Sequence, residues 1–283
     1  MQRIRLLNII IEYMEVLRMK NFTQKEIEYI INAYENGISK NKLRLEFGVS
    51  EGVIKRILEK NNIKIRQVQE SNKRKFNIND NYFDIESPNM AYIMGLWAAD
   101  GNVDSKENRL DLELNSLDLE ILEKIRNELQ SERPIKVYQC QNGYIKNKLL
   151  FWSSHIKHKF AEYGIVPNKT YSKDFHAPYK LNKQYWIDYI RGFFDGDGCV
   201  KKNTSLTFEL NSINQQFLKD IQDFFLKKYN IQTSLSIAHN RPNQYTMYRL
   251  YCYGNNAKKI YEVLYTPNSL FLKRKYDRWQ ELL

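Results

Sequence analysis

Long hydrophobic runs are absent from this sequence, and cysteine is scarce. No apolar run reaches the ~18 residues that a membrane-spanning helix needs, so no membrane contact is expected. The three cysteines, Cys140, Cys199 and Cys252, show no metal-ligand spacing and cannot all pair with one another. They therefore predict a reducing, intracellular and cytoplasmic location.

A targeting signal is also missing from the N-terminus. The segment MQRIRLLNIIIEYMEVLRMK starts like a signal peptide, but Glu12 and Glu15 interrupt its apolar run and no small-residue cleavage site follows. We expect the segment to be helical or disordered. Met1 and Met19 are both open as the start of the protein.

Positive charge is abundant. The 283 residues contain 44 Lys and Arg against 33 Asp and Glu, a net charge of +11. Solubility alone accounts for a modest positive charge, but the 20 tyrosines beside it favour a nucleic-acid surface. A hydrophobic content of 42% is enough for a packed core.

Two similar stretches stand out, IMGLWAADG at residues 93–101 and IRGFFDGDG at residues 190–198. Each is typical of a helix that ends at a glycine, which suits the left-handed position after a helix. Small residues four apart give each helix a face without bulky side chains, so the two helices are expected to pack backbone against backbone. These interface residues are Gly95, Ala99, Gly192 and Gly196.

An aspartate precedes the final glycine of each stretch. Asp100 and Asp197 would lie at the negative end of a helix dipole, where a carboxylate is disfavoured. Packing the two helices would bring the carboxylates together, which requires a compensating positive charge. A hard divalent cation with oxygen ligands satisfies that requirement.

These residues resemble the LAGLIDADG homing endonucleases, in the single-chain form with two motifs. The resemblance implies that the motif helices form the interface of two αββαββα halves. It also implies about two or three Mg²⁺ ions, replaceable by Mn²⁺. The implied metal-binding residues are Asp100, Asp197, Gly101 and Gly198.

The second copy matches the motif well, whereas the first departs from it. Trp97 and Ala98 stand where the motif has isoleucine and its first aspartate. That aspartate is not the family's metal ligand, so the expected metal site is unaffected. The alternative is a pair of unrelated buried helices with C-terminal glycines.

Residues 1–66 predict a small all-α domain. The phrase KNKLRLEFGVSEGVIKRILEKNNI resembles a helix-turn-helix, in which the helix after the GVS turn enters the DNA major groove. A small helical bundle with a solvated charged face is the alternative. The expected DNA-binding residues are Lys55, Arg56, Lys60 and Arg66. Residues 67–86 are polar and basic and predict a linker, which either crosses the DNA backbone or serves as a solvated tether.

Residues 87–283 repeat one pattern, with halves at about 87–178 and 179–283. ELNS occurs at Glu113–Ser116 and again at Glu209–Ser212, and Pro167-Asn168 recurs as Pro267-Asn268. In the first half we expect helix 88–100, strands 102–104 and 109–115, helix 116–129, strands 135–140 and 146–152, and helix 155–163. In the second we expect a motif helix, strand 206–211, helix 217–228, strands 233–239 and 245–253, and helix 256–264. The fold class is α+β, a pseudo-twofold pair of αββαββα units forming a saddle of two antiparallel sheets.

Each sheet should have one leucine-rich face and one polar face that contacts DNA. The first polar face is expected to carry Arg109, Lys136, Tyr138, Gln139, Lys146 and Lys148. The second is expected to carry Lys201, Ser236, His239, Arg241, Gln244 and Arg249.

The sequence thus predicts a site-specific double-strand DNA endonuclease. The resemblance implies a monomer on a long asymmetric target, a staggered cut across the minor groove with 3′ overhangs, and basic residues that polarise solvent near the metals. Lys148 and Arg249 are the candidates for that role, at corresponding places in the two halves. Lys169, Lys273 and Lys275 are further candidates. No intein splicing residues flank the chain, so it is expected to be encoded in an intron or between genes.

Two alternatives remain open. One is a non-cleaving transcription regulator with a LAGLIDADG-like core, against which the retention of Asp100 and Asp197 counts. The other is a maturase that binds RNA and assists splicing of its own intron.

Overall fold

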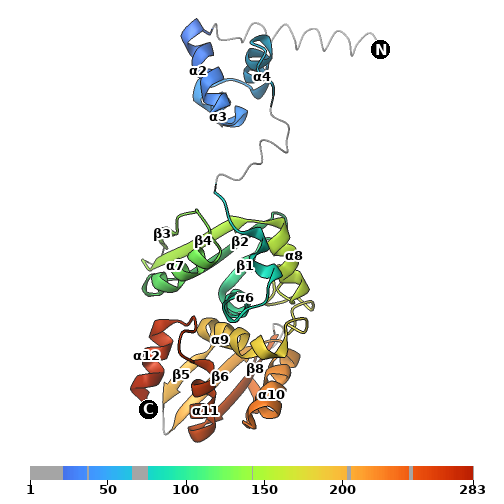
Figure 1. Cartoon of the computed structure of the whole chain (residues 1–283), viewed down its shortest axis with the longest axis vertical. Coiled ribbons are helices and arrows are strands. Elements are labelled where there is room, and N and C mark those ends of the chain that lie inside the picture. The colour runs from blue at the N-terminus through green and yellow to red at the C-terminus, as the bar shows by residue number, and fades with distance from the viewer. Residues whose placement is uncertain are drawn as a thin grey trace, which may run out of the picture. The chain divides into compact units, whose positions relative to one another are not determined.

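A computed structural model describes residues 22–36, 38–65, 76–141, 143–202, 205–241 and 245–282, without the side chains of Lys202 and Arg241. The chain divides into two compact units, Met1–Lys75 and Phe76–Leu283, and each is considered by itself (Figure 1). Predictions for residues 1–21, Arg66 and Gln244 lie outside the described residues.

The first unit contains the helices α2 (Gln24–Glu35), α3 (Lys40–Phe47) and α4 (Glu51–Lys60). Thr23 begins α2 with a capping box, because its hydroxyl accepts from the amide of Glu26 while the Glu26 carboxylate accepts from the amide of Thr23.

A left-handed glycine separates α3 from α4. Gly48 ends α3 at a φ of +66°, a conformation that glycine adopts without steric cost. Ile30, Leu43 and Ile54, one from each helix, are completely buried and form the core of the unit. The described residues of the first unit therefore form a small all-α bundle.

The second unit consists of two halves of the same kind. The first half contains η1 (Asp80–Asp84), α6 (Pro88–Asp100), β1 (Gly101–Val103), β2 (Arg109–Asn115), η2 (Ser116–Asp118), α7 (Leu119–Glu128), β3 (Lys136–Gln139), β4 (Ile145–Trp152) and α8 (Ser154–Glu162). The second half contains η3 (Lys183–Tyr185), α9 (Trp186–Asp197), β5 (Cys199–Lys202), β6 (Leu206–Ser212), α10 (Gln215–Tyr229), β7 (Ser234–Arg241), β8 (Tyr245–Tyr253), α11 (Gly254–Leu264) and α12 (Lys273–Leu282).

The two sheets have the same topology, with strand orders β1-β2-β4-β3 and β5-β6-β8-β7 and antiparallel pairing throughout. Alternating leucines of β2 and β6 face the core, as the period of two in the sequence indicates. The predicted pair of αββαββα units with two antiparallel sheets is confirmed.

Helices α6 and α9 pack together between the two sheets (Figure 1). A Cβ atom on Gly95 would lie 1.9 Å from the carbonyl oxygen of Tyr189, and one on Gly192 would lie 2.0 Å from that of Tyr92. Any side chain at either position would therefore collide with the backbone of the opposite helix. The small residues are where the helices touch.

The second unit begins earlier than the predicted linker allows. Residues from Phe76 belong to it, and Phe83 in η1 is completely buried, with its ring 4.9 Å from that of Phe160 in α8. The prediction of a linker that extends to residue 86 is therefore wrong at its C-terminal end. A few apolar residues in a polar stretch are a weak sequence signal, but Phe83, with Ile78 and Tyr82 packed against the core, anchors the segment.

Helix α12 was not predicted, because its sequence is dominated by charged residues. It is fixed by Trp279, whose buried ring stacks on Tyr261 and Tyr265 at 5.6 Å in each case. One aromatic side chain thus replaces the broad apolar face that usually identifies a helix in sequence.

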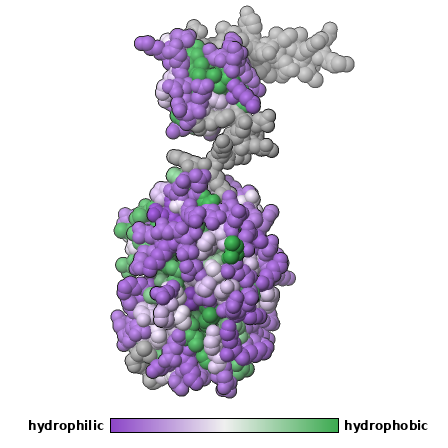
Figure 2. Space-filling view, viewed as in Figure 1, coloured by the Kyte–Doolittle hydropathy of each residue, from purple (hydrophilic) through white to green (hydrophobic). Residues whose placement is uncertain are grey.

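The surface is mainly hydrophilic on the face shown in Figure 2. Within the described ranges, no helix combines the length and the apolar character that crossing a membrane would need.

Candidate functional site

Asp100 and Asp197 meet where α6 and α9 end. A Cβ atom on Gly196 would lie 2.3 Å from the Cβ of Ala99 and 3.1 Å from Oδ2 of Asp100, so the carboxylate of one helix lies against the last turn of the other. Both aspartates keep part of their surface exposed to solvent, although the surrounding protein desolvates their carboxyl groups. The juxtaposition that the two motifs predict is thus present in the structure.

The final glycines adopt a conformation other than the predicted one. Gly101 and Gly198 both have a φ of −76°, in the extended region, so the expectation of a left-handed cap is wrong. The chain passes directly from each helix into a strand. Glycine is required for a different reason, since a Cβ would lie 2.1 Å from the ring of Trp97 or of Phe194.

The two carboxylates influence each other's ionisation. Burial by the surrounding protein and the negative charge of Asp100 raise the pKa of Asp197 to about 6, while Lys169 and Lys275 oppose the rise. Burial also raises the pKa of Asp100, again opposed by Lys275 and Lys169. The acid pair is therefore held in an environment where full ionisation is costly without nearby cations.

Those cations come from the chain segments that follow α8 in the first half and α11 in the second. The ammonium group of Lys169 donates to the carbonyl of Gly101, and that of Lys275 donates to the carbonyl of Gly198 at 2.6 Å. The two lysines thus occupy matching positions at the ends of the two motif helices.

Lys275 also caps the C-terminus of α9. Its ammonium donates to the carbonyls of Phe194 at 2.7 Å and of Gly196 at 3.2 Å, which places a positive charge at the negative end of the helix dipole. Burial lowers the pKa of Lys275 to about 8, although Asp195 and the motif aspartates oppose the shift. Burial likewise lowers the pKa of Lys169, against the pull of Asp197 and Asp100.

The basic residues that the sequence favoured, Lys148 and Arg249, pair with carboxylates of the sheets. The ammonium of Lys148 is 2.8 Å from a carboxylate oxygen of Glu113, and a guanidinium nitrogen of Arg249 is 3.8 Å from one of Glu209. The prediction that they stand at corresponding places is also wrong. The strand register aligns Lys146, opposite Asn115, with Arg249, opposite Asn211. Catalysis by Lys148 and Arg249 stays a prediction.

The first aspartate of the second motif has a structural role. Asp195 is completely buried and accepts from the hydroxyls of Tyr92 at 2.9 Å and Tyr265 at 2.7 Å, and from the amide of Leu272 at 2.7 Å. It ties α9 to α6 and to the segment that carries Lys275. The absence of this aspartate from the first motif therefore leaves the acid pair itself unchanged.

The polar face of the first sheet pairs most of its cations with carboxylates. Lys146 and Lys148 both contact Glu113, at 2.7 and 2.8 Å, and Tyr138 donates to the same carboxylate. The Nε of Arg109 lies 3.3 Å from Asp111. These residues lie on one face, as expected, and so does Lys136, which is opposite Lys148.

Gln139 is the exception in the first sheet. It pairs with Ile145, one residue away from the Tyr138–Lys146 pair, so it belongs to the opposite face. Its amide donates to the carbonyl of Gly143 and stabilises the hairpin turn. The placement of Gln139 on the polar face was wrong.

In the second sheet a bulge decides which residues share a face. Regular alternation would separate Ser236 from His239, but the register shifts between Ile237 and His239 and returns His239 to the face of Ser236 and Arg249. Lys201 lies on this face too and pairs with Glu209 at 2.8 Å. Arg241 is the last residue of β7, and the structure does not describe its side chain.

In the first unit, the predicted DNA-contacting residues belong to the last helix. Lys55 and Lys60 of α4 are exposed, and Arg56 is partly buried. The ammonium of Lys55 lies 3.6 Å from a carboxylate oxygen of Glu59.

The acid pair fits a divalent cation that keeps much of its water. Within the described part of the chain, no cluster of three or more His, Cys, Asp or Glu could hold a metal. Two carboxylates and the glycine carbonyls of Gly101 and Gly198 remain as oxygen donors. Mg²⁺ typically binds through one or two carboxylates, water and substrate phosphates, so this donor set suits it.

The family follows from sequence and fold together. The family model described as "LAGLIDADG-like domain" matches residues 87–163 and 187–265, one match in each half. The chain belongs to the LAGLIDADG-like domain family.

Curated relatives share modest sequence identity. The ribonucleoside-diphosphate reductase NrdEB subunit alpha of Bacillus subtilis (strain 168) is 26% identical over 196 residues, which cover 64% of this chain and 18% of that protein. The uncharacterized protein MJ0314 of Methanocaldococcus jannaschii is 27% identical over 226 residues, 73% of this chain and 72% of that protein. The uncharacterized protein MJ0398 of the same organism is 24% identical over 289 residues, 95% of this chain and 98% of that protein.

Solved structures with a similar arrangement include two kinds of protein. A mesophilic variant of the homing endonuclease I-DmoI has a TM-score of 0.45 and 16% identity, covering 68% of this chain and 96% of that chain. Full-length DUF199/WhiA from Thermatoga maritima has a TM-score of 0.43 and 14% identity, covering 72% of this chain and 63% of that chain.

Proposed function

We propose that the second unit is a site-specific double-strand DNA endonuclease that hydrolyses one phosphodiester in each strand. The observation that carries this proposal is the pair of carboxylates, Asp100 and Asp197, at the adjoining ends of α6 and α9. A structural role does not require an acid at the negative end of each helix. Binding a cation and a phosphate between the two halves does require an acid at each helix end.

Asp100 and Asp197 would hold Mg²⁺, which activates water and stabilises the leaving oxygen when bound. Lys169 and Lys275 would hold the helix ends in place and favour the ionised carboxylates. Their positive charges would also attract the phosphate of a bound strand.

The polar faces of the two sheets would contact the DNA. Their cations are held by Glu113, Asp111 and Glu209, which fixes their side chains in advance and reduces the entropic cost of binding. Arg249, Lys146 and the exposed ends of the hairpins would then approach phosphates and base edges.

The first unit would add DNA contacts through α4. Its exposed Lys55 and Lys60 follow the turn at Gly48, as in a helix-turn-helix. This role for the first unit rests on the pattern of caps and charges.

A non-cleaving DNA-binding regulator is the second candidate, and one observation favours it. Lys169 and Lys275 already bind the carbonyls of Gly101 and Gly198, so the negative charge at the two helix ends is partly neutralised without metal. The names of the similar structures include both a homing endonuclease and DUF199/WhiA.

Selection from a random double-stranded DNA library separates these candidates. The full chain is incubated with the library in Mg²⁺ or Mn²⁺, and bound and cleaved molecules are sequenced separately. We expect cleavage at one long asymmetric site. Asp100→Asn and Asp197→Asn should each abolish cutting while retaining binding, because the amide removes an anionic ligand without adding bulk. Specific binding by the wild-type protein without cleavage in either metal would establish the regulator instead.

A further inference from the structure

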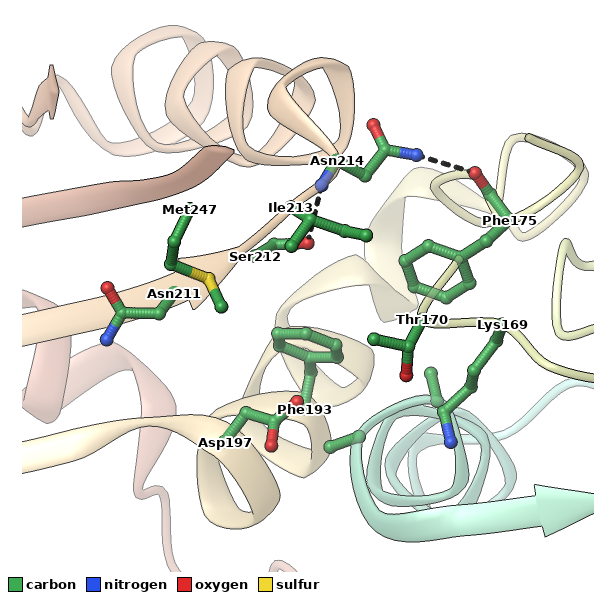
Figure 3. A pocket seen from close by; sticks show the side chains of 12 residues that line it. Lys169, Thr170, Phe175, Phe193, Asp197, Asn211, Ser212, Ile213, Asn214 and Met247 are labelled. Atoms are coloured by element: carbon green, nitrogen blue, oxygen red, sulfur yellow. Dashed lines mark hydrogen bonds between the residues drawn. The ribbon is translucent and has the colours of Figure 1, made fainter. Parts of the chain in front are cut away.

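A cavity of about 290 Å³ lies beside Asp197, between the second sheet and the segment that follows the first half. It is lined by Thr170 and Phe175 from that segment, Phe193 from α9 and Met247 from β8 (Figure 3). Its volume is at the small end of the range for ligand pockets.

The floor of this cavity is rigid. Phe175 and Phe193 are buried, and both pack on Phe217 of α10, with ring centroids 5.1 and 4.7 Å apart. The amide of Asn214 donates to the carbonyl of Phe175 at 2.7 Å and holds the segment in place (Figure 3). The aromatic surface is therefore formed before any ligand binds.

In the first half, an ion pair stands at the position that corresponds to Asn214. Asp118 corresponds to Asn214, because both follow the repeated ELNS and both begin a helix. Asp118 is bound by Arg274 from α12, whose Nε lies 2.9 and 3.0 Å from the two carboxylate oxygens. The second half has a neutral amide and an aromatic ring there in place of the ion pair.

We propose that this cavity accepts one unstacked nucleobase from the DNA strand that passes Asp197. The inference rests on the proposed binding of double-stranded DNA by the second unit. The cavity lies at the inner end of the polar sheet face, since Met247 shares that face with Arg249.

The lining suits a base better than a phosphate. Two phenyl rings and a thioether offer a surface on which any base can stack. Thr170, Asn211 and Ser212 supply neutral hydrogen-bonding groups at the rim, as a base edge requires. Among the described residues of the lining, Lys169 is the one that carries a positive charge. A phosphate subsite would need more positive charge and would not need two aromatic rings.

Fluorescence of 2-aminopurine tests this proposal. The base analogue is placed in turn at each position near the cut in the target obtained by selection, on either strand, and the full chain is added with Ca²⁺ to allow binding without cleavage. We expect a severalfold increase in fluorescence at one position on one strand only, since stacking on the neighbouring bases of a duplex quenches 2-aminopurine and entry into the cavity ends that stacking. A flat response at every position, in complexes whose formation is verified by gel shift, would overturn the proposal and leave DNA binding intact.

A pair of matched variants assigns the signal to the cavity. Met247→Trp narrows the cavity with a bulky ring and should remove the increase. Tyr144→Trp introduces the same residue at the corresponding position of the first half and should preserve the increase, because Tyr144 is exposed. An increase that survives Met247→Trp would place the unstacked base elsewhere and overturn the proposal. Failure of the wild-type chain to bind any DNA would refute the proposed function itself.

Discussion

Asp197 carries its charge at an unfavourable place, at the C-terminus of α9 and beside Asp100. Lys275 reduces the cost by donating to three carbonyls of the same helix end. Natural selection retains such an arrangement where the charge is used. The energetic cost of the acid pair is therefore open to measurement without any assay of activity.

The first prediction concerns stability and pH in the absence of metal. Burial and Asp100 raise the pKa of Asp197 from 3.8 in the unfolded chain to about 6. The folded protein thus binds the proton more tightly than the unfolded chain, so stability falls as the pH rises from 3.8 to about 6 and is constant above that. Asp197→Asn should therefore raise the melting temperature at about pH 8 and have little effect at about pH 4.

The measurement is thermal unfolding in EDTA at both pH values. Asp277→Asn is the matched control, since its carboxylate is at the surface and pairs with Lys273. Equal effects of Asp197→Asn at the two pH values would mean that Asp197 ionises normally.

A second prediction at this scale separates Lys275 from its neighbour. Lys275→Met should lower the cleavage rate by about 10- to 100-fold, as loss of a group that orients metal ligands typically does. Lys273→Met removes the same charge from an exposed residue two positions away and should leave the rate nearly unchanged. Equal losses in single-turnover cleavage of the selected target would show that only net charge matters.

At the scale of elements, the contact between α6 and α9 determines how the halves are held. The two helix backbones can approach this closely only because glycine has no side chain. A single methyl group on Gly95 would lie 1.9 Å from the carbonyl oxygen of Tyr189. Helix backbones that approach this closely leave no space to relax. The interface should therefore tolerate substitution poorly.

Gly95→Ala tests this expectation. Overpacking should destabilise the second unit by about 1–3 kcal/mol or more. Gly52→Ala is the control, because the nearest atom to its Cβ would be Ser50 Oγ at 3.8 Å. Urea unfolding of both variants gives the comparison, and an unchanged midpoint for Gly95→Ala would mean that the two helices are further apart.

At the scale of the whole molecule, the two units are expected to divide affinity from chemistry. Removing Met1–Lys75 deletes α4 with Lys55 and Lys60 but leaves both aspartates of the acid pair in place. Binding should weaken, and its dependence on salt should become shallower by about 0.9 in log–log slope for each phosphate that is no longer neutralised. The cut position should not move.

Footprinting and salt titration of the truncated and full-length chains provide the test. An unchanged footprint and slope would show that the first unit does not bind DNA. A shifted cut would show that the catalytic residues were assigned to the wrong part of the chain.

The sequence by itself determined the duplication, the two motif helices and the pair of acids. Each of these is a local pattern: small residues four apart, an acid before a glycine, and strands of period two repeated in both halves. Asp100 and Asp197 could be named because both motifs carry the acid at the same place.

Tertiary structure alone decided which cations serve those acids. Lys169 and Lys275 stand at different offsets from the repeated Pro-Asn pairs, yet both reach the carbonyl of a final motif glycine. The hairpin register decided that Lys146, and not Lys148, corresponds to Arg249. Such contacts depend on the packing of segments far apart in sequence, on bulges and on the paths of loops. None of these features leaves a periodic pattern of residues in the sequence.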